Sequence, residues 1–209
     1  MLNDMKTLAY VFLADGFEEI EAICPSDVLR RSTKDVNLVS ISDSLTVTSA
    51  HGVKVLADMT LDAFLVQWKD VASVMDPAKC LLVFPGGIPG AVNLATCEPL
   101  MAVAAEHFSK GGLLGAICAA PGTVLPVIDE WLQAKGLPGI AGRKFTCYPG
   151  CEKHPLALGA VHEALPCVTD GHLVTANGPG SAMEFAYALA SLFISPGAVE
   201  TLRRGMMYN

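Results

Sequence analysis

The sequence predicts a doubly wound α/β sandwich with a mostly parallel central sheet. Three apolar segments lead to this prediction, because each is almost continuously hydrophobic, as strands buried on both faces of a parallel sheet are. Each is followed by a turn containing glycine or proline and then by a stretch with helical spacing, which is the rhythm of βαβ units. The segments are Thr7–Ala14, Ala78–Phe84 and Gly112–Ile117.

The other elements are predicted from local alternation, helical spacing and turn residues. Val36–Ser42 alternates as a strand, and two alternating runs flank His51-Gly52, which predicts an antiparallel hairpin. Pro25 is expected to bend or break the helix after the first strand. No repeat or linker divides the chain, so we expect a single domain over residues 1–209. The further predicted helices are Pro99–Phe108, Ala119–Ile128, Ala182–Phe193 and Ala198–Arg204, and the further strands are Phe145–Gly150 and Val168–Ala176.

Composition and charge exclude several classes of protein. Hydrophobic residues make up 52% of the 209 residues and charged residues 17%, which is too apolar for a disordered chain. The apolar runs are too short to span a bilayer, and the N-terminus lacks the apolar core of a signal peptide, so we expect a cytoplasmic protein. A net charge of −7, with no basic cluster larger than Arg30-Arg31 or Arg203-Arg204, argues against nucleic acid as a partner. The seven cysteines are expected to be free thiols, most of them structural.

Three segments that follow strands converge on one edge of the predicted sheet. They are Asp15–Glu21, Pro85–Gly90 and Cys118–Ala120. In doubly wound folds, sites form outside the carboxyl ends of the strands. We therefore expect the functional site where these three segments meet.

Cys118 is the candidate nucleophile of this site. It follows an apolar strand, small residues flank it, and Pro121 marks a helix start just beyond it. A sulfur at such a turn faces the unpaired N–H groups of the helix start, so its pKa is expected to lie below that of an ordinary thiol. The local pattern alone is equally compatible with a buried structural thiol.

Two further features complete the predicted chemistry. Backbone N–H groups in the Gly86-Gly87 turn and at Ala119 are candidate donors to an oxyanion on a substrate bound to the sulfur. Glu21, near a helix start, is a candidate proton donor whose pKa burial would raise. Each feature also has a plainer interpretation, since Pro-Gly turns are common and acidic residues are usual in a first helical turn.

Four motifs along the chain resemble one known family. They are ADGFEEIEAICPSDVLRR, FPGGIPGAVNL, GAICAAP and NGPGSAMEFA. Together they look like the successive signatures of the ThiJ/PfpI superfamily, in the branch of the Parkinsonism-associated protein deglycase, and they cover the chain from Leu8 to Phe193. The resemblance implies a flavodoxin-like sandwich, similar to glutamine amidotransferases, that forms homodimers.

The resemblance also implies roles for residues. Cys118 matches the nucleophilic, redox-sensitive cysteine, and Glu21 matches the buried acid that hydrogen-bonds its sulfur. Gly87 and Ala119 match the backbone donors, and Gly86 completes their turn.

The activity implied is a cofactor-independent glyoxalase or protein deglycase. Such an enzyme converts methylglyoxal or glyoxal to hydroxy acids, or removes their adducts, in defence against carbonyl or oxidative stress. The alternative is a non-enzymatic redox sensor or protective protein, in which Cys118 is oxidised to sulfinic acid.

Three departures limit what the resemblance implies. Several relatives carry a His in a T-x-H-P segment, where this chain has Tyr148, so turnover is expected to be slow and Tyr148 to hydrogen-bond instead. The protease-like branch has a His directly after its cysteine, and here that residue is Ala119, so peptidase activity is not expected. Asn177 replaces the family's basic residue before G-P-G, which removes an anion contact.

A metal-binding module is a weaker interpretation. Cys147, Cys151 and His154 form a C-x3-C-x2-H cluster with His162 beyond it. No second cysteine pair follows at the spacing of a zinc finger, so we expect a polar turn there, and no metal or cofactor in the site. The remaining histidines, His51, His107 and His172, are expected to be solvated.

Overall fold

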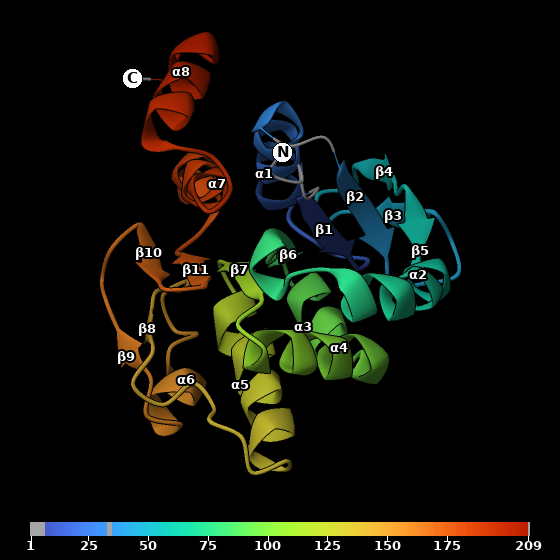
Figure 1. Cartoon of the computed structure of the whole chain (residues 1–209), viewed down its shortest axis with the longest axis vertical. Helices are drawn as coiled ribbons and strands as arrows, with labels where there is room; N and C mark the ends of the chain where they lie inside the picture. The colour runs from blue at the N-terminus through green and yellow to red at the C-terminus, as the bar shows by residue number, and fades with distance from the viewer. Residues whose placement is uncertain (1–6, 33–34, 209) are drawn as a thin grey trace.

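A central sheet of seven strands runs through the described part of the chain, which in this computed structural model comprises residues 7–32 and 35–208 (Figure 1). The strand order is β10-β11-β7-β6-β1-β2-β5. Every neighbouring pair is parallel except β10 and β11. The strands are β1 (Leu8–Leu13), β2 (Asp35–Ser40), β5 (Met59–Thr60), β6 (Cys80–Phe84), β7 (Leu113–Ile117), β10 (Cys167–Asp170) and β11 (Leu173–Ala176).

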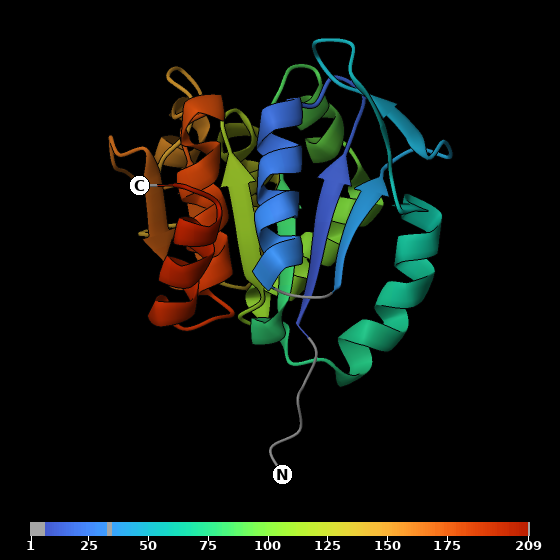
Figure 2. The same ribbon diagram turned by 90° about the horizontal axis from the view of Figure 1, so that it is seen from above.

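Helices cover both faces of this sheet, which confirms the predicted doubly wound sandwich (Figure 2). On one face lie α1 (Glu19–Ser32) and α7 (Ala182–Ser191), and α8 (Pro196–Gly205) packs on α7 without a buried residue of its own. The other face carries α2 (Leu61–Val74), α3 (Gly90–Ala95), α4 (Glu98–Ser109) and α5 (Ala120–Gln133). The sheet therefore separates two hydrophobic cores.

Two small sheets and several short helices lie outside the central sheet. The predicted hairpin is confirmed, since β3 (Thr46–Thr48) pairs antiparallel with β4 (Lys54–Leu56). A second small sheet joins β8 (Lys144–Phe145) to β9 (Val161–His162), and α6 (Lys153–Ala157) lies between them in the sequence. Two 3-10 helices complete the set: η1 (Pro77–Lys79) and η2 (Pro179–Ser181).

Two expectations about these elements were wrong, and one helix was missed. Helix α1 continues through the buried Pro25, because its packing against β1 and α7 outweighs the loss of one helical hydrogen bond. The strand predicted over Phe145–Gly150 ends at Phe145. Beyond it the chain forms a turn, which the Cys151 N–H closes by donating to the Tyr148 carbonyl at 3.0 Å. Helix α2 was not predicted at all.

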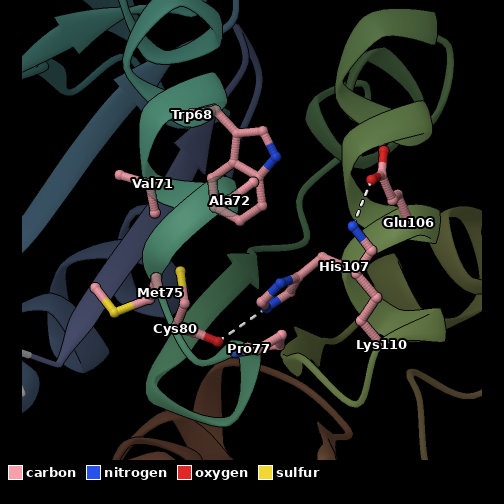
Figure 3. A pocket seen from close by; sticks show the side chains of 9 residues that line it. All are labelled: Trp68, Val71, Ala72, Met75, Pro77, Cys80, Glu106, His107 and Lys110. Atoms are coloured by element: carbon pink, nitrogen blue, oxygen red, sulfur yellow. Dashed lines mark hydrogen bonds and ion pairs between the residues drawn. The ribbon is translucent and has the colours of Figure 1, made fainter.

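His107 was also expected to be solvated, but it is buried between α2 and α4. Its Nε2 lies 2.9 Å from the Cys80 carbonyl oxygen, and its ring contacts the Trp68 ring edge-on (Figure 3). Burial lowers the pKa of His107 to about 4, so the imidazole is neutral at physiological pH. The cavity beside it has a volume of about 20 Å³, room for roughly one water molecule. His172 is half-buried against the Phe108 ring, whereas His51 is exposed as expected.

None of the helices in the described ranges combines the length and the hydropathy that a bilayer crossing requires.

Phe64 should anchor α2 to the sheet, because it is fully buried and its ring packs edge-on against Tyr10 and Phe12. We expect Phe64→Ala to lower the free energy of unfolding by about 3–5 kcal/mol in urea denaturation. Val66→Ala on the same helix is the matched control, since Val66 is 69% exposed and its loss should cost less than about 0.5 kcal/mol. Equal losses from both substitutions would contradict this packing.

Candidate functional site

The three predicted segments meet at the carboxyl edge of the sheet, where two of them are tied together by their backbones. The Glu18 N–H donates to the Gly86 carbonyl oxygen at 3.0 Å, and the Gly90 N–H donates to the Gly16 carbonyl oxygen at 3.2 Å. These loops follow β1 and β6, which are neighbours in the sheet. Adjacent parallel strands therefore bring Glu21 and the Gly86-Gly87 turn to the same place.

Cys118 forms the third corner, at the turn between β7 and α5. Its φ is 64°, a left-handed conformation that is uncommon for a residue with a side chain. Two hydrogen bonds hold it: the Cys118 N–H donates to the Ala176 carbonyl, and the Tyr148 N–H donates to the Cys118 carbonyl, each at 2.8 Å. Backbone strain held by surrounding structure in this way is a common feature of functional sites.

Glu21 lies in the first turn of α1 with no exposed surface. Its Oε2 accepts a hydrogen bond of 2.8 Å from the Gly86 N–H. Its Oε1 is buried without a well-aligned hydrogen-bond partner among the described residues. The Cys118 thiol interacts with the same carboxyl group, so the thiol proton is the donor that the carboxylate can recruit.

Gly86 lies between these two side chains. A Cβ at this position would come within 2.6 Å of both the Cys118 Cβ and Glu21 Oε2. Only glycine therefore lets the thiol and the carboxyl group approach each other across this turn.

Two backbone amides from different loops act on the sulfur. The N–H groups of Gly87 and Ala119 lie close enough to the Cys118 sulfur to lower the pKa of its thiol. Gly87 has a φ of 85° and packs tightly against the Gly16 carbonyl, so the turn requires glycine here too. The predicted donors thus surround the sulfur, where an oxygen bound to it would also lie.

Burial dominates the electrostatics of this pair. It raises the pKa of the Glu21 carboxyl to about 7, against smaller opposing effects of the hydrogen bonds from Cys118 and Gly86. With Glu21 ionised, burial and then the adjacent carboxylate raise the pKa of the Cys118 thiol to about 12, and the amides of Gly87 and Ala119 oppose this only in part.

The predicted lowering of the Cys118 pKa is therefore wrong while Glu21 is ionised. The sequence argument counted the donors at the helix start but not the carboxylate that the fold places against the sulfur. When Glu21 is protonated, that charge is absent and the carboxyl O–H becomes a donor, so the same contact favours the thiolate. The two groups consequently titrate as a coupled pair.

Tyr148 is joined to the site mainly through its backbone. Its side chain is 50% exposed, and its ring lies near Gly178. Within the described ranges, no residue hydrogen-bonds its hydroxyl group, so this hydroxyl is free to meet a ligand. Asn177, in the neighbouring G-P-G segment, accepts a hydrogen bond of 2.7 Å from the Ser181 hydroxyl.

Cys147, Cys151 and His154 of the C-x3-C-x2-H cluster do not gather as a set of potential metal ligands within the described residues. In the part of the chain that the structure describes, potential metal ligands gather closely only at Glu18, Glu19 and His51. The sequence analysis missed this group, because His51 is more than thirty residues from the two glutamates and was treated only as part of a turn. The acidic Glu18-Glu19 pair at the start of the first helix was the available signal.

The raised pKa of Glu21 predicts how stability depends on pH. The ordinary pKa of a glutamate is 4.5, and that of Glu21 in the folded state is about 7. Between these two pH values, Glu21 of the folded protein keeps a proton that it has lost in the unfolded chain. Stability should therefore fall as pH rises through this window, by about 3 kcal/mol relative to Glu21→Gln. We expect this in urea denaturation of both proteins in a Cys118→Ala background, where only the carboxyl group titrates.

Glu106→Gln is the control for this measurement. Lys110 lowers the pKa of the Glu106 carboxyl, so Glu106→Gln should lower stability by a constant amount across the whole window, and this difference should disappear only below pH 4.5. If the difference in the free energy of unfolding between the chains with and without Glu21 did not change with pH, the prediction that Glu21 is buried and protonated would be wrong.

Comparisons with known proteins agree with this architecture. A family model described as the DJ-1/PfpI family matches residues 7–192. Protein dj-1beta of Drosophila melanogaster is 31% identical over 204 residues, which cover 97% of this chain and 98% of that protein. Its crystal structure gives a TM-score of 0.80 over 98% of this chain and all of that chain.

Two further relatives differ in length and name. Glutathione-independent glyoxalase DJR-1.2 of Caenorhabditis elegans is 29% identical over 197 residues, 94% of each protein. Protein DJ-1 homolog B of Arabidopsis thaliana is 35% identical over 178 residues, which are 85% of this chain. The match takes up only 36% of that longer protein, and 40% of the related homolog A. With its fold, its motifs and this matched range, the chain belongs to the DJ-1/PfpI family.

Proposed function

We propose that this protein is a cysteine-dependent, cofactor-independent enzyme that converts methylglyoxal or glyoxal to hydroxy acids, or removes their adducts from other molecules. The observation that carries the proposal is the buried Glu21–Cys118 pair beneath two backbone donors. A carboxyl group with a pKa of about 7 can accept and return a proton at physiological pH.

The first step uses this pair directly. Glu21 takes the thiol proton, and the Cys118 sulfur attacks the aldehyde carbon of the dicarbonyl. The carbonyl oxygen becomes an alkoxide, which the Gly87 and Ala119 amides are placed to stabilise. Returning the proton from Glu21 to this oxygen gives a neutral hemithioacetal.

The next steps move two protons. Glu21 removes the C–H proton of the hemithioacetal and delivers it to the neighbouring carbonyl oxygen, which gives a neutral enediol. Glu21 then takes the O–H proton from the carbon that carries the sulfur and returns it to the neighbouring carbon. The product is a thioester of Cys118. Water then hydrolyses the thioester, which releases the hydroxy acid and restores the thiol, so the reaction consumes one dicarbonyl and one water.

Tyr148 stands where several relatives have an imidazole, so Glu21 must carry the proton transfers alone. The free Tyr148 hydroxyl is assigned to substrate binding, as a hydrogen-bond partner of the second carbonyl. We expect slow turnover for this reason. The name of the C. elegans relative, a glutathione-independent glyoxalase, supports this class of reaction.

A redox role is the second candidate, and one observation favours it. The Gly87 and Ala119 amides already lower the pKa of the Cys118 thiol, and they would equally stabilise a sulfinate there. Hydrogen peroxide titration followed by intact-mass analysis separates the two functions. Stoichiometric oxidation of Cys118 without any dicarbonyl turnover would favour the sensor.

The same proposal includes a homodimer and a cytoplasmic location. An open apolar groove of about 590 Å³ is lined by exposed side chains of α1, including Ile20 and Ile23, together with Val53, Met183 and Met206. A second copy of the chain would cover this surface. All seven cysteines are free thiols, which suits a reducing compartment.

Replacing either member of the catalytic pair should abolish most of the activity. In a methylglyoxal consumption assay with hydroxy-acid detection, Glu21→Gln should lose roughly 10²- to 10⁴-fold, as expected for a general acid–base. Cys118→Ser should lose more, because the nucleophile itself is weakened. Cys24→Ser is the control, since Cys24 is half-buried in α1 and takes no part in the mechanism. If Cys118→Ser consumed methylglyoxal at the wild-type rate, the proposed mechanism would be wrong.

The dimer prediction is tested at the groove. Ile23→Glu puts a charge on the apolar surface of α1, so we expect a dimer of the wild-type chain to become a monomer in analytical ultracentrifugation. Val66→Glu places the same charge on the exposed face of α2 and should leave the dimer intact. A monomeric wild-type chain, or dissociation by both substitutions, would show that the groove is not the dimer interface.

A further inference from the structure

We propose that Asn93 is a positioning residue of the site, whose side chain holds the turn that carries the Gly87 amide against the loop after β1. Asn93 lies in α3, the short helix that follows this turn, and it touches neither the sulfur of Cys118 nor the carboxyl group of Glu21. Its effect on turnover rests on the proposed function, whereas its effect on the reactivity of the Cys118 thiol does not.

The Asn93 side chain joins α3 to the loop after β1. Its Nδ2 donates a hydrogen bond of 3.0 Å to the backbone carbonyl oxygen of Asp15. Asp15 is itself fixed from the other side, because its Oδ1 accepts a hydrogen bond of 2.8 Å from the Thr48 N–H in β3. Asn93 therefore attaches α3 to a residue that the hairpin already holds.

Helix α3 passes this attachment on to Gly87. The Ala91 N–H donates to the Gly87 carbonyl oxygen at 2.8 Å, and the Asn93 N–H donates to the Pro89 carbonyl oxygen at 2.9 Å. The end of the turn and the start of the helix are thus hydrogen-bonded to each other as one unit. A shift of α3 relative to β1 would move the Gly87 N–H with it.

The turn after β6 and the loop after β1 touch through their backbones, which leaves no flexible side chains between them to absorb a shift. A Cβ at Gly87 would come within 2.5 Å of the Gly16 carbonyl oxygen, and one at Gly90 within 2.5 Å of the Phe17 nitrogen. In so close a contact, the hydrogen bonds that cross it determine how the two segments lie.

Among the residues that the structure describes, Asn93 is the one residue outside the catalytic pair whose side chain makes such a crossing hydrogen bond. The other crossing bonds come from the backbone N–H groups of Glu18 and Gly90 and from the Glu21 carboxyl group, which accepts from Gly86. The Asn93 bond can therefore be removed by a substitution that leaves the reacting groups in place.

The chemical consequence runs through the Gly87 amide. This amide and that of Ala119 lower the pKa of the Cys118 thiol. A hydrogen bond weakens steeply as its angle departs from linearity, so a turn that shifts away from the sulfur loses this effect. The same amide is assigned to the alkoxide of the proposed reaction, so Asn93 acts on the thiolate and on the transition state through Gly87.

Alkylation of Cys118 tests the proposal without any turnover. Iodoacetamide is added to the full chain in a Glu21→Gln background, where the thiol alone titrates and Gln still offers an acceptor to the Gly86 N–H. The thiolate displaces iodide, and peptide mapping by mass spectrometry gives the rate constant at Cys118 against pH. We expect Asn93→Ala to raise the midpoint of this profile by about half a pH unit, as the weakening of one hydrogen bond to the thiolate would.

Val92→Ala is the matched control, because Val92 precedes Asn93 in α3, is 42% exposed and makes no side-chain hydrogen bond. It should keep the midpoint of the parent chain. Asn93→Asp retains the shape of the side chain without its N–H donor, so it should shift the midpoint as Asn93→Ala does. Circular dichroism checks folding, and Asn93→Asp decides the test where Asn93→Ala does not fold.

Turnover of methylglyoxal by the chain with Glu21 intact gives a second measurement. Asn93→Ala should lower kcat about 10- to 100-fold, the range expected when a group that acts on the transition state is displaced. KM should stay within about twofold of the wild-type value, because the Gly87 amide binds the alkoxide, which forms only after the substrate has bound.

Two results would overturn the proposal: an unshifted alkylation profile in the folded Asn93 variants, or an equal shift in Val92→Ala. A shift in the Asn93 variants alone supports it. A wild-type chain that consumes no methylglyoxal would overturn the proposed function instead, and the alkylation profile would still decide the role of Asn93.

Discussion

The site depends on one close contact, in which Glu21 and Cys118 face each other across the backbone of Gly86. The Gly86 N–H fixes Glu21 Oε2, and the missing side chain of Gly86 leaves the space that the Cys118 Cβ and the carboxyl group occupy. Both groups are removed from bulk solvent, so either charge is costly and two charges are more so. A pair in this situation holds one proton over a wide pH range, and its reactivity depends on which atom carries that proton.

This contact in turn requires the order of the sheet. Strands β1, β6 and β7 are adjacent and parallel, so the three loops that follow them begin side by side. The loops after β1 and β6 approach each other closely at Gly87, which packs against the Gly16 carbonyl where a side chain would not fit. Cys118 adopts its left-handed conformation within this frame, held by hydrogen bonds to Ala176 and from Tyr148. The strained residue is thus stabilised by elements that are distant in the sequence.

How much of the structure could be predicted from the sequence depends on which interactions are local in the chain. Continuous apolar runs predicted β1, β6 and β7, and the rule that sites lie at the carboxyl edge predicted which loops meet. Helix α2 was missed although its buried residues, Leu61, Phe64 and Trp68, recur at the i, i+3 and i+7 spacing of an amphipathic helix, a local pattern that the sequence does contain. The burial of His107 and the raised pKa of Cys118 depend on contacts between elements, which no local pattern contains.

The phenol of Tyr148 limits which group of the site can act as a base. A phenol is a poor base at physiological pH, so the only described group beside the sulfur that can exchange a proton there is Glu21, whose pKa of about 7 suits that task. The charge of Glu18, one helical turn away, contributes to this raised pKa.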